Sequence, residues 1–261
     1  MGFKMGIVGL PNVGKSTLFN ALTRTAAAQA ANFPFCTIEP NVGEVAVPDA
    51  RLDKLAVIAG SKQIIPTRMT FVDIAGLVRG ASKGEGLGNQ FLANIRECDA
   101  IAHVLRCFED GDITHVEGKI DPVADAETIE TELMLADMES VERRLTALGK
   151  KLRGGDQDTL DQDRLLRAAL AALEKGQPAR TLAIADDDRK QWRMLQLLTA
   201  KPVLFVCNVE EASAASGNSQ SARVAEMAAK QGAASVVISA RIEEEISQLA
   251  EDEAAMFLEE M

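Results

Sequence analysis

The chain has 261 residues, of which 47% are hydrophobic and 26% are charged. This balance is ordinary for a folded globular protein and excludes disordered and collagen-like chains. The length is sufficient for one or two domains with a substantial hydrophobic core. The net charge is −11, but eight acidic residues and no basic ones follow Arg241, which leaves the rest of the chain at −3. A body so close to neutral leaves local contact with nucleic acid open.

The sequence carries no sign of export or of a membrane helix. Its apolar runs are far shorter than the roughly 20 residues that span a bilayer. The first residues continue directly into a glycine-rich motif instead of forming a leader peptide. The four cysteines lack CxxC spacing, which favours reduced thiols in the core. We therefore expect a cytoplasmic protein without membrane contact, and we expect a monomer.

Short apolar runs alternate with helical patterns along most of the chain. Phe3–Val8 predicts a buried strand, and a helix is expected to begin near Lys15. Further strands are predicted at residues 68–74, 100–107, 202–207 and 234–239. Buried strands that alternate with helices predict an α/β fold, a mostly parallel sheet with helices on both faces.

Residues 125–200 depart from this alternation because they contain no strand pattern. A heptad seam of apolar residues is formed by Met134, Met138, Val141, Leu145, Leu148 and Leu152. Gly154 and Gly155 then break the helix, and a second helical pattern follows. We predict that residues 125–200 form an antiparallel coiled-coil hairpin inserted in an α/β domain made of residues 1–124 and 201–261. The alternative is that these are ordinary surface helices of the sheet.

Residues 9–16, GLPNVGKS, fit the phosphate-binding pattern GxxxxGK[ST]. The glycines let backbone N–H groups approach phosphate oxygens, and the following helix adds the positive end of its dipole. Lys15 would reach the β- and γ-phosphates, and the Ser16 hydroxyl would ligate Mg²⁺. The nucleotide-binding residues expected here are Asn12, Val13, Gly14, Lys15, Ser16 and Thr17.

A second motif, DxxG, begins at Asp73 and ends at Gly76, directly after a predicted strand. Asp73 would hold Mg²⁺, and the backbone N–H of Gly76 would sense the γ-phosphate. Lys15 and Gly76 are therefore the candidate catalytic residues. Thr37 lies between the first helix and this strand, where a switch loop offers a hydroxyl to Mg²⁺. The alternative for Thr37 is a plain loop residue.

Two loops are expected on the base side of the site. Residues 208–211, NVEE, stand where guanine-specific relatives carry NKxD. Asn208 is kept, but Val209 replaces the lysine and Glu211 the aspartate, so guanine selectivity should be weakened. The last base-side loop is expected at Ser239, Ala240 and Arg241. Together the motifs have the order found in a Ras-like P-loop domain of the translation-factor class.

Three further segments resemble the Obg-like ATPase family, which is also called the YchF family. They are residues 32–41 and residues 71–78 with 80–89, together with residues 106–108. Residues 115–119 are also similar to the family, and the likeness covers nearly the whole chain. The resemblance implies an inserted coiled-coil hairpin, ATP preferred over GTP, and partners on the ribosome or RNA. It places Asn208 at the adenine amino group and Phe108 beside the base.

The resemblance also bears on hydrolysis. Leu77 stands after DxxG, where Ras-like enzymes have a glutamine that positions the attacking water, so we expect slow intrinsic hydrolysis. Asn12 lies where some related enzymes bind K⁺; the alternative is that it only braces the loop. The family continues into a C-terminal TGS domain, which we expect this chain to lack.

Three functional hypotheses follow. The first is a Mg²⁺-dependent ATPase that acts as a switch. The second is a GTPase with the same mechanism. The third is a nucleotide-gated module that binds RNA or the ribosome and whose hydrolysis is incidental.

Overall fold

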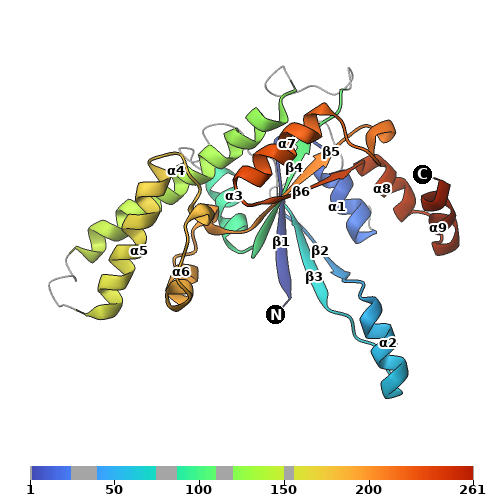
Figure 1. Ribbon diagram of the computed structural model, residues 1–261, viewed down its shortest axis with the longest axis horizontal. Helices are drawn as coiled ribbons and strands as arrows, with labels where there is room; N and C mark the ends of the chain where they lie inside the picture. The colour runs from blue at the N-terminus through green and yellow to red at the C-terminus, as the bar shows by residue number, and fades with distance from the viewer. Residues whose placement is uncertain (1, 25–39, 75–86, 110–119, 150–155, 261) are drawn as a thin grey trace.

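The computed structural model describes residues 2–24, 40–74, 87–109, 120–149 and 156–260 (Figure 1). Its centre is a six-stranded sheet with strand order β2-β3-β1-β4-β5-β6. The strands are β1 Phe3–Val8, β2 Asn41–Ala46, β3 Arg68–Asp73, β4 Ala100–Arg106, β5 Val203–Asn208 and β6 Ala234–Ile238. All neighbours pair in parallel except β2 and β3. The predicted α/β fold is confirmed.

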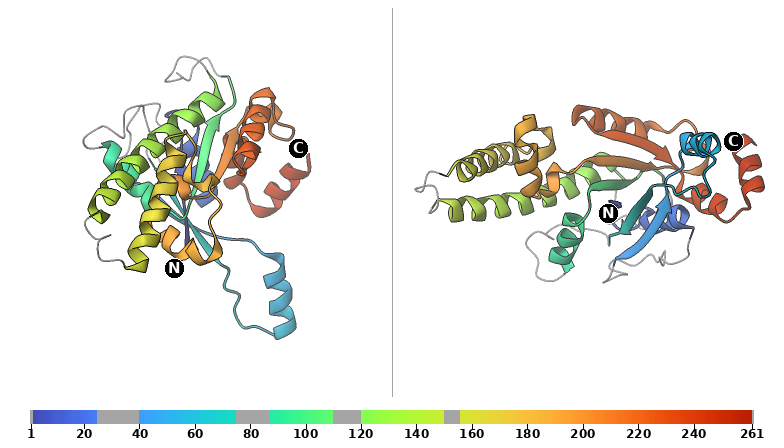
Figure 2. Two further views of the ribbon diagram at one scale, coloured as in Figure 1. Left: turned by 60° about the vertical axis from the view of Figure 1, so that its left-hand side comes forward. Right: turned by 90° about the horizontal axis from the view of Figure 1, so that it is seen from below.

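Helices cover both faces of this sheet. Figure 2 shows α1 and α3 on one side and α7 on the other. The α-helices are α1 Lys15–Thr23, α2 Ala50–Ala59, α3 Leu87–Arg96, α4 Pro122–Leu148, α5 Gln157–Leu173, α6 Arg189–Met194, α7 Ser219–Lys230, α8 Ala240–Ser247 and α9 Glu251–Glu260. Within the ranges described above, none of them is both long and apolar enough to cross a bilayer.

Burial explains which strands the sequence revealed. Every residue of β4 is buried, because this strand lies at the centre and is covered on both faces. Its sequence is accordingly an almost continuous apolar run. The antiparallel edge strand β2 was not predicted, since its residues are half-buried or exposed and Gly43 interrupts the pattern. Helix α2 was also missed, and it buries none of its residues.

The long helix α4 serves two hydrophobic cores. It begins at Pro122, after Asp121 caps the backbone N–H of Ala124. Its first half packs against the sheet, and its second half packs against α5 and the segment that returns to β5. The residues in the sheet core are Ala126, Ile129, Leu133 and Ala136. Those in the second core include Val141, Leu148, Leu165, Leu166, Ala169, Leu195 and Leu197.

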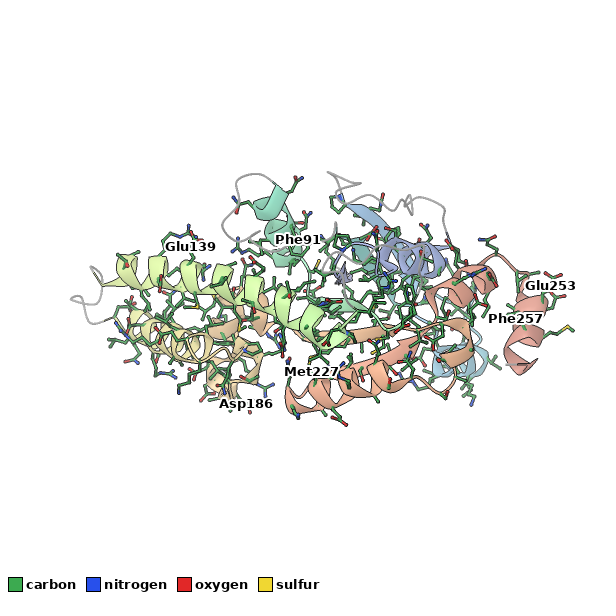
Figure 3. The ribbon with its side chains drawn as sticks, turned by 90° about the horizontal axis from the view of Figure 1, so that it is seen from above. Phe91, Glu139, Asp186, Met227, Glu253 and Phe257 are labelled. Atoms are coloured by element: carbon green, nitrogen blue, oxygen red, sulfur yellow. The ribbon has the colours of Figure 1, made fainter. Side chains whose placement is uncertain are left out.

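The predicted heptad seam therefore describes only the far half of α4. Val141 and Leu148 are buried as expected, whereas Met134 and Met138 are half-buried beside the positions that face the sheet. Helices α4 and α5 lie side by side in Figures 1 and 2. Glu139 projects from α4 away from α5 (Figure 3). The bounds predicted for the inserted segment stay a prediction, and its first dozen residues contribute to the core of the sheet.

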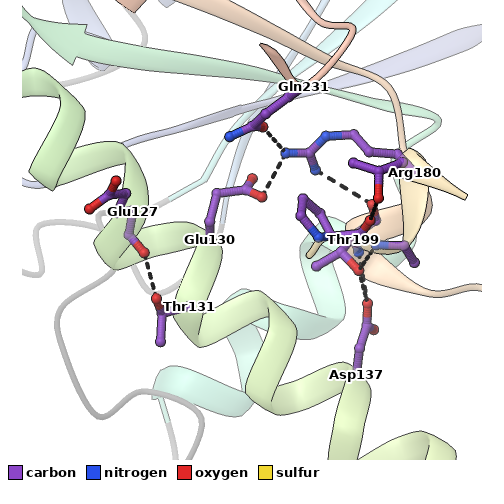
Figure 4. Close-up of polar contacts among 10 residues, drawn as sticks. Glu127, Glu130, Thr131, Asp137, Arg180, Thr199 and Gln231 are labelled. Atoms are coloured by element: carbon purple, nitrogen blue, oxygen red, sulfur yellow. Dashed lines mark hydrogen bonds and ion pairs between the residues drawn. The ribbon is translucent and has the colours of Figure 1, made fainter. Parts of the chain in front are cut away.

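A polar junction joins α4 to the segment before β5 and to the end of α7 (Figure 4). Its members Glu130, Asp137 and Thr199 are buried, and Arg180 and Gln231 are half-buried. The Asp137 carboxylate accepts hydrogen bonds from the backbone N–H of Leu198 at 2.8 Å and of Thr199 at 2.8 Å, and from the Thr199 hydroxyl at 2.7 Å. Arg180 donates to Glu130 at 2.6 Å and to Gln231 at 2.8 Å. These contacts fix where the second core meets the sheet.

Candidate nucleotide-binding site

The loop between β1 and α1 is shaped by two glycines that have no room for a side chain. A Cβ on Gly9 would lie 2.5 Å from the carbonyl oxygen of Val104. A Cβ on Gly14 would lie 2.4 Å from Nδ2 of Asn208, and its φ of 96° belongs to the left-handed region that favours glycine. The predicted phosphate-binding loop is thus a tight turn packed on β4 and β5 that opens directly into α1.

Lys15 is the first residue of α1 and is 8% exposed. Its Nζ donates to the carbonyl oxygen of Leu10 at 2.8 Å, so the side chain folds back over the loop. Burial lowers the pKa of Lys15 to about 8, and the charge of Asp73 opposes this shift. At neutral pH the ammonium is therefore mostly protonated.

Ser16 and Asp73 meet next to Lys15. The Ser16 hydroxyl donates to Oδ2 of Asp73 at 3.1 Å, and Asp73 is 4% exposed. The pairing of β1 with β3 brings them together, because Asp73 lies opposite Ile7 and β1 leads into the loop. Burial raises the pKa of Asp73, while the charge of Lys15 and the bond from Ser16 lower it.

These two oxygen donors fit a magnesium ion. Mg²⁺ prefers oxygen ligands and in nucleotide sites is held by one or two protein groups, with phosphates and water completing the shell. In the part of the chain that the structure describes, no cluster of three or more His, Cys, Asp or Glu residues is placed to hold a metal. A magnesium site at Ser16 and Asp73 would depend on the nucleotide for its remaining ligands.

Asn208, the last residue of β5, links the phosphate-binding loop to the start of α8. Its Nδ2 donates to the carbonyl oxygen of Val13 at 3.0 Å, and its Oδ1 accepts from the backbone N–H of Ala240 at 2.9 Å. It is 6% exposed. Sequence reasoning missed this bridging role, because nothing local connects residues 13, 208 and 240. The expected contact with an adenine amino group stays a prediction, and one hydrogen of Nδ2 is not committed to Val13.

The other predicted base-side residues differ in how exposed their side chains are. Val209 is buried, and its backbone N–H donates to the carbonyl oxygen of Ile238 at 2.9 Å. Ser239 and Ala240 are buried as well. Glu211 and Arg241 are exposed and form an ion pair of 3.1 Å between Oε1 and Nε, which joins the two predicted base-side loops.

The remaining predicted site residues lie in the phosphate-binding loop, in α1, after β4 or outside the described residues. Asn12 has a φ of 63° inside the loop, and Thr17 lies in the first turn of α1. Phe108 is half-buried just beyond the end of β4. Thr37 and Gly76 lie outside the described residues, so the structure places neither of them.

Known proteins are similar in sequence to this chain over its whole length. A family model described as "50S ribosome-binding GTPase" matches residues 4–140. "Ribosome-binding ATPase YchF" from Bacillus subtilis (strain 168) is 52% identical over 263 residues, which cover 100% of this chain and 72% of that relative. The chain belongs to the YchF family. The YchF relative from Escherichia coli O157:H7 is 51% identical, over 100% of this chain and 71% of its own.

A solved YchF structure shares the fold as well. The match is to the "Structure of the Schizosaccharomyces pombe YchF GTPase", with a TM-score of 0.81 and 36% identity over 99% of this chain and 71% of that one. The resemblance to the YchF family and the P-loop fold expected from it are confirmed.

Proposed function

We propose that this chain binds and hydrolyses ATP, in preference to GTP, with Mg²⁺ as the metal. The observation that carries the proposal is the meeting of Lys15, Ser16 and Asp73 at a loop whose glycines leave no room for side chains. Its support comes from relatives that are about half identical and are named ribosome-binding ATPases.

Each group has a task that its chemistry suits. Lys15 exchanges the Leu10 carbonyl for the β- and γ-phosphates, and its ammonium is mostly charged at neutral pH. Ser16 and Asp73 would hold Mg²⁺, which would neutralise charge on the phosphate oxygens. The N-terminus of α1 adds backbone N–H groups aimed at the same anion. Gly76, Thr37 and a K⁺ ion at Asn12 belong to this proposal as further groups around the phosphates.

The preference for ATP rests on the base-side loops. A guanine needs a carboxylate that accepts from its ring N–H and amino groups. Here Glu211 stands at that position and is already paired with Arg241, which lowers its value as a partner for guanine. The names of similar proteins differ on this point, since the bacterial relatives are called ATPases and the yeast structure a GTPase. GTP hydrolysis by the same residues is the second candidate function.

We further propose a cytoplasmic protein that works with the ribosome, in line with the names of its bacterial relatives. The projecting part of the α4–α5 hairpin is the surface we assign to that contact. A nucleotide-gated ribosome-binding module with incidental hydrolysis would show binding that changes between the triphosphate and diphosphate states and falls with salt.

Titration calorimetry with ATP and GTP side by side, each with Mg²⁺, tests the proposal. We expect tighter binding of ATP. Lys15→Ala should lose most of the affinity and turnover, whereas Lys54→Ala, on the exposed helix α2, should keep both. Unchanged affinity in Lys15→Ala would refute the phosphate site, and tighter GTP binding would refute the preference for adenine.

A further inference from the structure

Arg106 is a buried cation at the carboxyl end of the central strand β4. It is 1% exposed and is the largest of the fully buried side chains in the described ranges. Its Nε donates to the carbonyl oxygen of Phe108 at 3.2 Å, and its Cζ lies 4.8 Å from the centroid of the Phe108 ring. Burying a guanidinium is costly unless its contacts repay the lost hydration. Two of those contacts go to a single residue, Phe108.

Both contacts restrict the same turn. The hydrogen bond fixes the backbone of residues 106–108, and the cation–π contact fixes the ring of Phe108 against it. With the guanidinium over one face of the ring, only the opposite face and the edge remain for another planar group. Phe108 itself is half-buried, so its ring is not fully enclosed by the core.

The turn lies beside the base-side loops of the site. Arg106 pairs in register with Asn208 of β5, and the backbone N–H of Cys107 donates to the carbonyl oxygen of Asn208 at 2.8 Å. The side chain of Asn208 in turn binds the carbonyl oxygen of Val13 in the phosphate-binding loop. Phe108 therefore follows the end of β4 close to Asn208, the residue that links the phosphate-binding loop to the base-side loops.

We propose that Arg106 is a positioning residue that holds Phe108 as a stacking wall for the purine base. This inference rests on the proposed nucleotide binding and deepens it. Stacking on an aromatic ring does not depend on the pattern of donors and acceptors, because every base has a π-face. Arg106 therefore strengthens the binding of ATP and GTP to a similar degree, and the choice between them is made elsewhere.

Only arginine can perform both tasks. Its planar guanidinium presents a donor at Nε and a flat cation to the ring at the same time, whereas the lysine ammonium is a compact point charge. Arg106→Lys should therefore restore little of what Arg106→Gln loses.

The test compares the affinities of ATP, GTP and inorganic tripolyphosphate, each with Mg²⁺, by titration calorimetry. Arg106→Gln should weaken both nucleotides on the order of tenfold, the usual scale of a lost stacking contact, and leave tripolyphosphate within about twofold. Phe108→Leu should do the same. The double variant Arg106→Gln/Phe108→Leu should be no weaker than Phe108→Leu alone, because Arg106 acts through the ring. Arg68→Gln and Phe3→Leu, both exposed, are the matched controls.

Two results would overturn the inference. One is an equal loss of nucleotide and tripolyphosphate affinity in Arg106→Gln, which would make Arg106 a general support of the loop. The other is an unchanged ATP affinity in Phe108→Leu, a variant that leaves the buried arginine in place. If Arg106→Gln fails to fold, Arg106→Lys replaces it, and full ATP affinity in that variant would also overturn the inference. If the proposed function itself were wrong, the unaltered protein would bind neither ATP nor GTP, so this outcome can be told apart from failure of the inference about Arg106.

Discussion

Asp137 should contribute strongly to stability, because one buried carboxylate satisfies three donors. In Asp137→Asn one acceptor oxygen becomes an NH₂ group that faces the backbone N–H and hydroxyl of Thr199, whose distances to Oδ2 of Asp137 are 2.8 and 2.7 Å. The hydroxyl already accepts from the backbone N–H of Ala179 at 3.1 Å, so it cannot turn freely to help. A buried donor without a partner costs about 1–3 kcal/mol. We expect Asp137→Asn to lower the free energy of unfolding by about 2 kcal/mol, and Asp137→Ala by about 4 kcal/mol.

Urea unfolding measures this loss, with two probes that report on different parts. Trp192 is the only tryptophan and packs against the second core, so its fluorescence follows the hairpin region. Far-ultraviolet circular dichroism follows the whole chain. The matched control is Glu139→Gln, two residues along α4 and exposed, which should stay within about 0.5 kcal/mol of the unaltered protein. An Asp137→Asn variant as stable as that control would refute the reasoning.

Two further predictions concern acid and the phosphate-binding loop. Burial, with the nearby charges of Arg180 and Lys15, lowers the pKa of His103 from 6.5 to about 3. Between pH 7.5 and 5 this histidine therefore becomes protonated in the unfolded chain but stays neutral in the folded one. This difference should lower the free energy of unfolding by about 2 kcal/mol as the pH falls from 7.5 to 5. Urea unfolding at both pH values should show that the free energy of unfolding falls less between pH 7.5 and 5 in His103→Gln than in the unaltered protein. Gly14→Ala should weaken ATP binding on the order of a hundredfold, because its Cβ would collide with Asn208; titration calorimetry measures this.

Each of these has a result that contradicts it. For His103 it is a variant whose loss of stability in acid equals that of the unaltered protein. For Gly14 it is ATP affinity kept by Gly14→Ala, with Gly60→Ala as the comparison, since Gly60 also has a positive φ but no atom near its missing Cβ.

The part of the site that depends on local sequence could be predicted. A phosphate-binding loop needs glycines, a lysine and a hydroxyl at fixed spacing, so the positions of Lys15 and Ser16 are visible in the sequence. Asp73 was predictable because it ends a strand that neighbours β1 in the fold class. The bridge made by Asn208 could not be foreseen, since its partners lie in two distant loops.

Errors in the helical region have a related cause. The heptad pattern correctly indicated a long amphipathic helix, but a period alone does not say which surface lies opposite. The first half of α4 faces a sheet, which shifts the buried stripe to Ile129, Leu133 and Ala136. The edge strand β2 and helix α2 were missed because both are largely exposed, and half-exposed segments carry little hydrophobic pattern.

The continuity of α4 has a mechanical consequence. The helix has 27 residues, which corresponds to about 40 Å, and its last stretch, residues 138–148, extends roughly 16 Å past Asp137. A rigid rod clamped at one end works as a lever. A tilt of roughly 10° where α4 leaves the sheet would carry its far end through about 3 Å. A small rearrangement at this exit point would thus become a larger displacement at the far end of α4, without any change inside the helix itself.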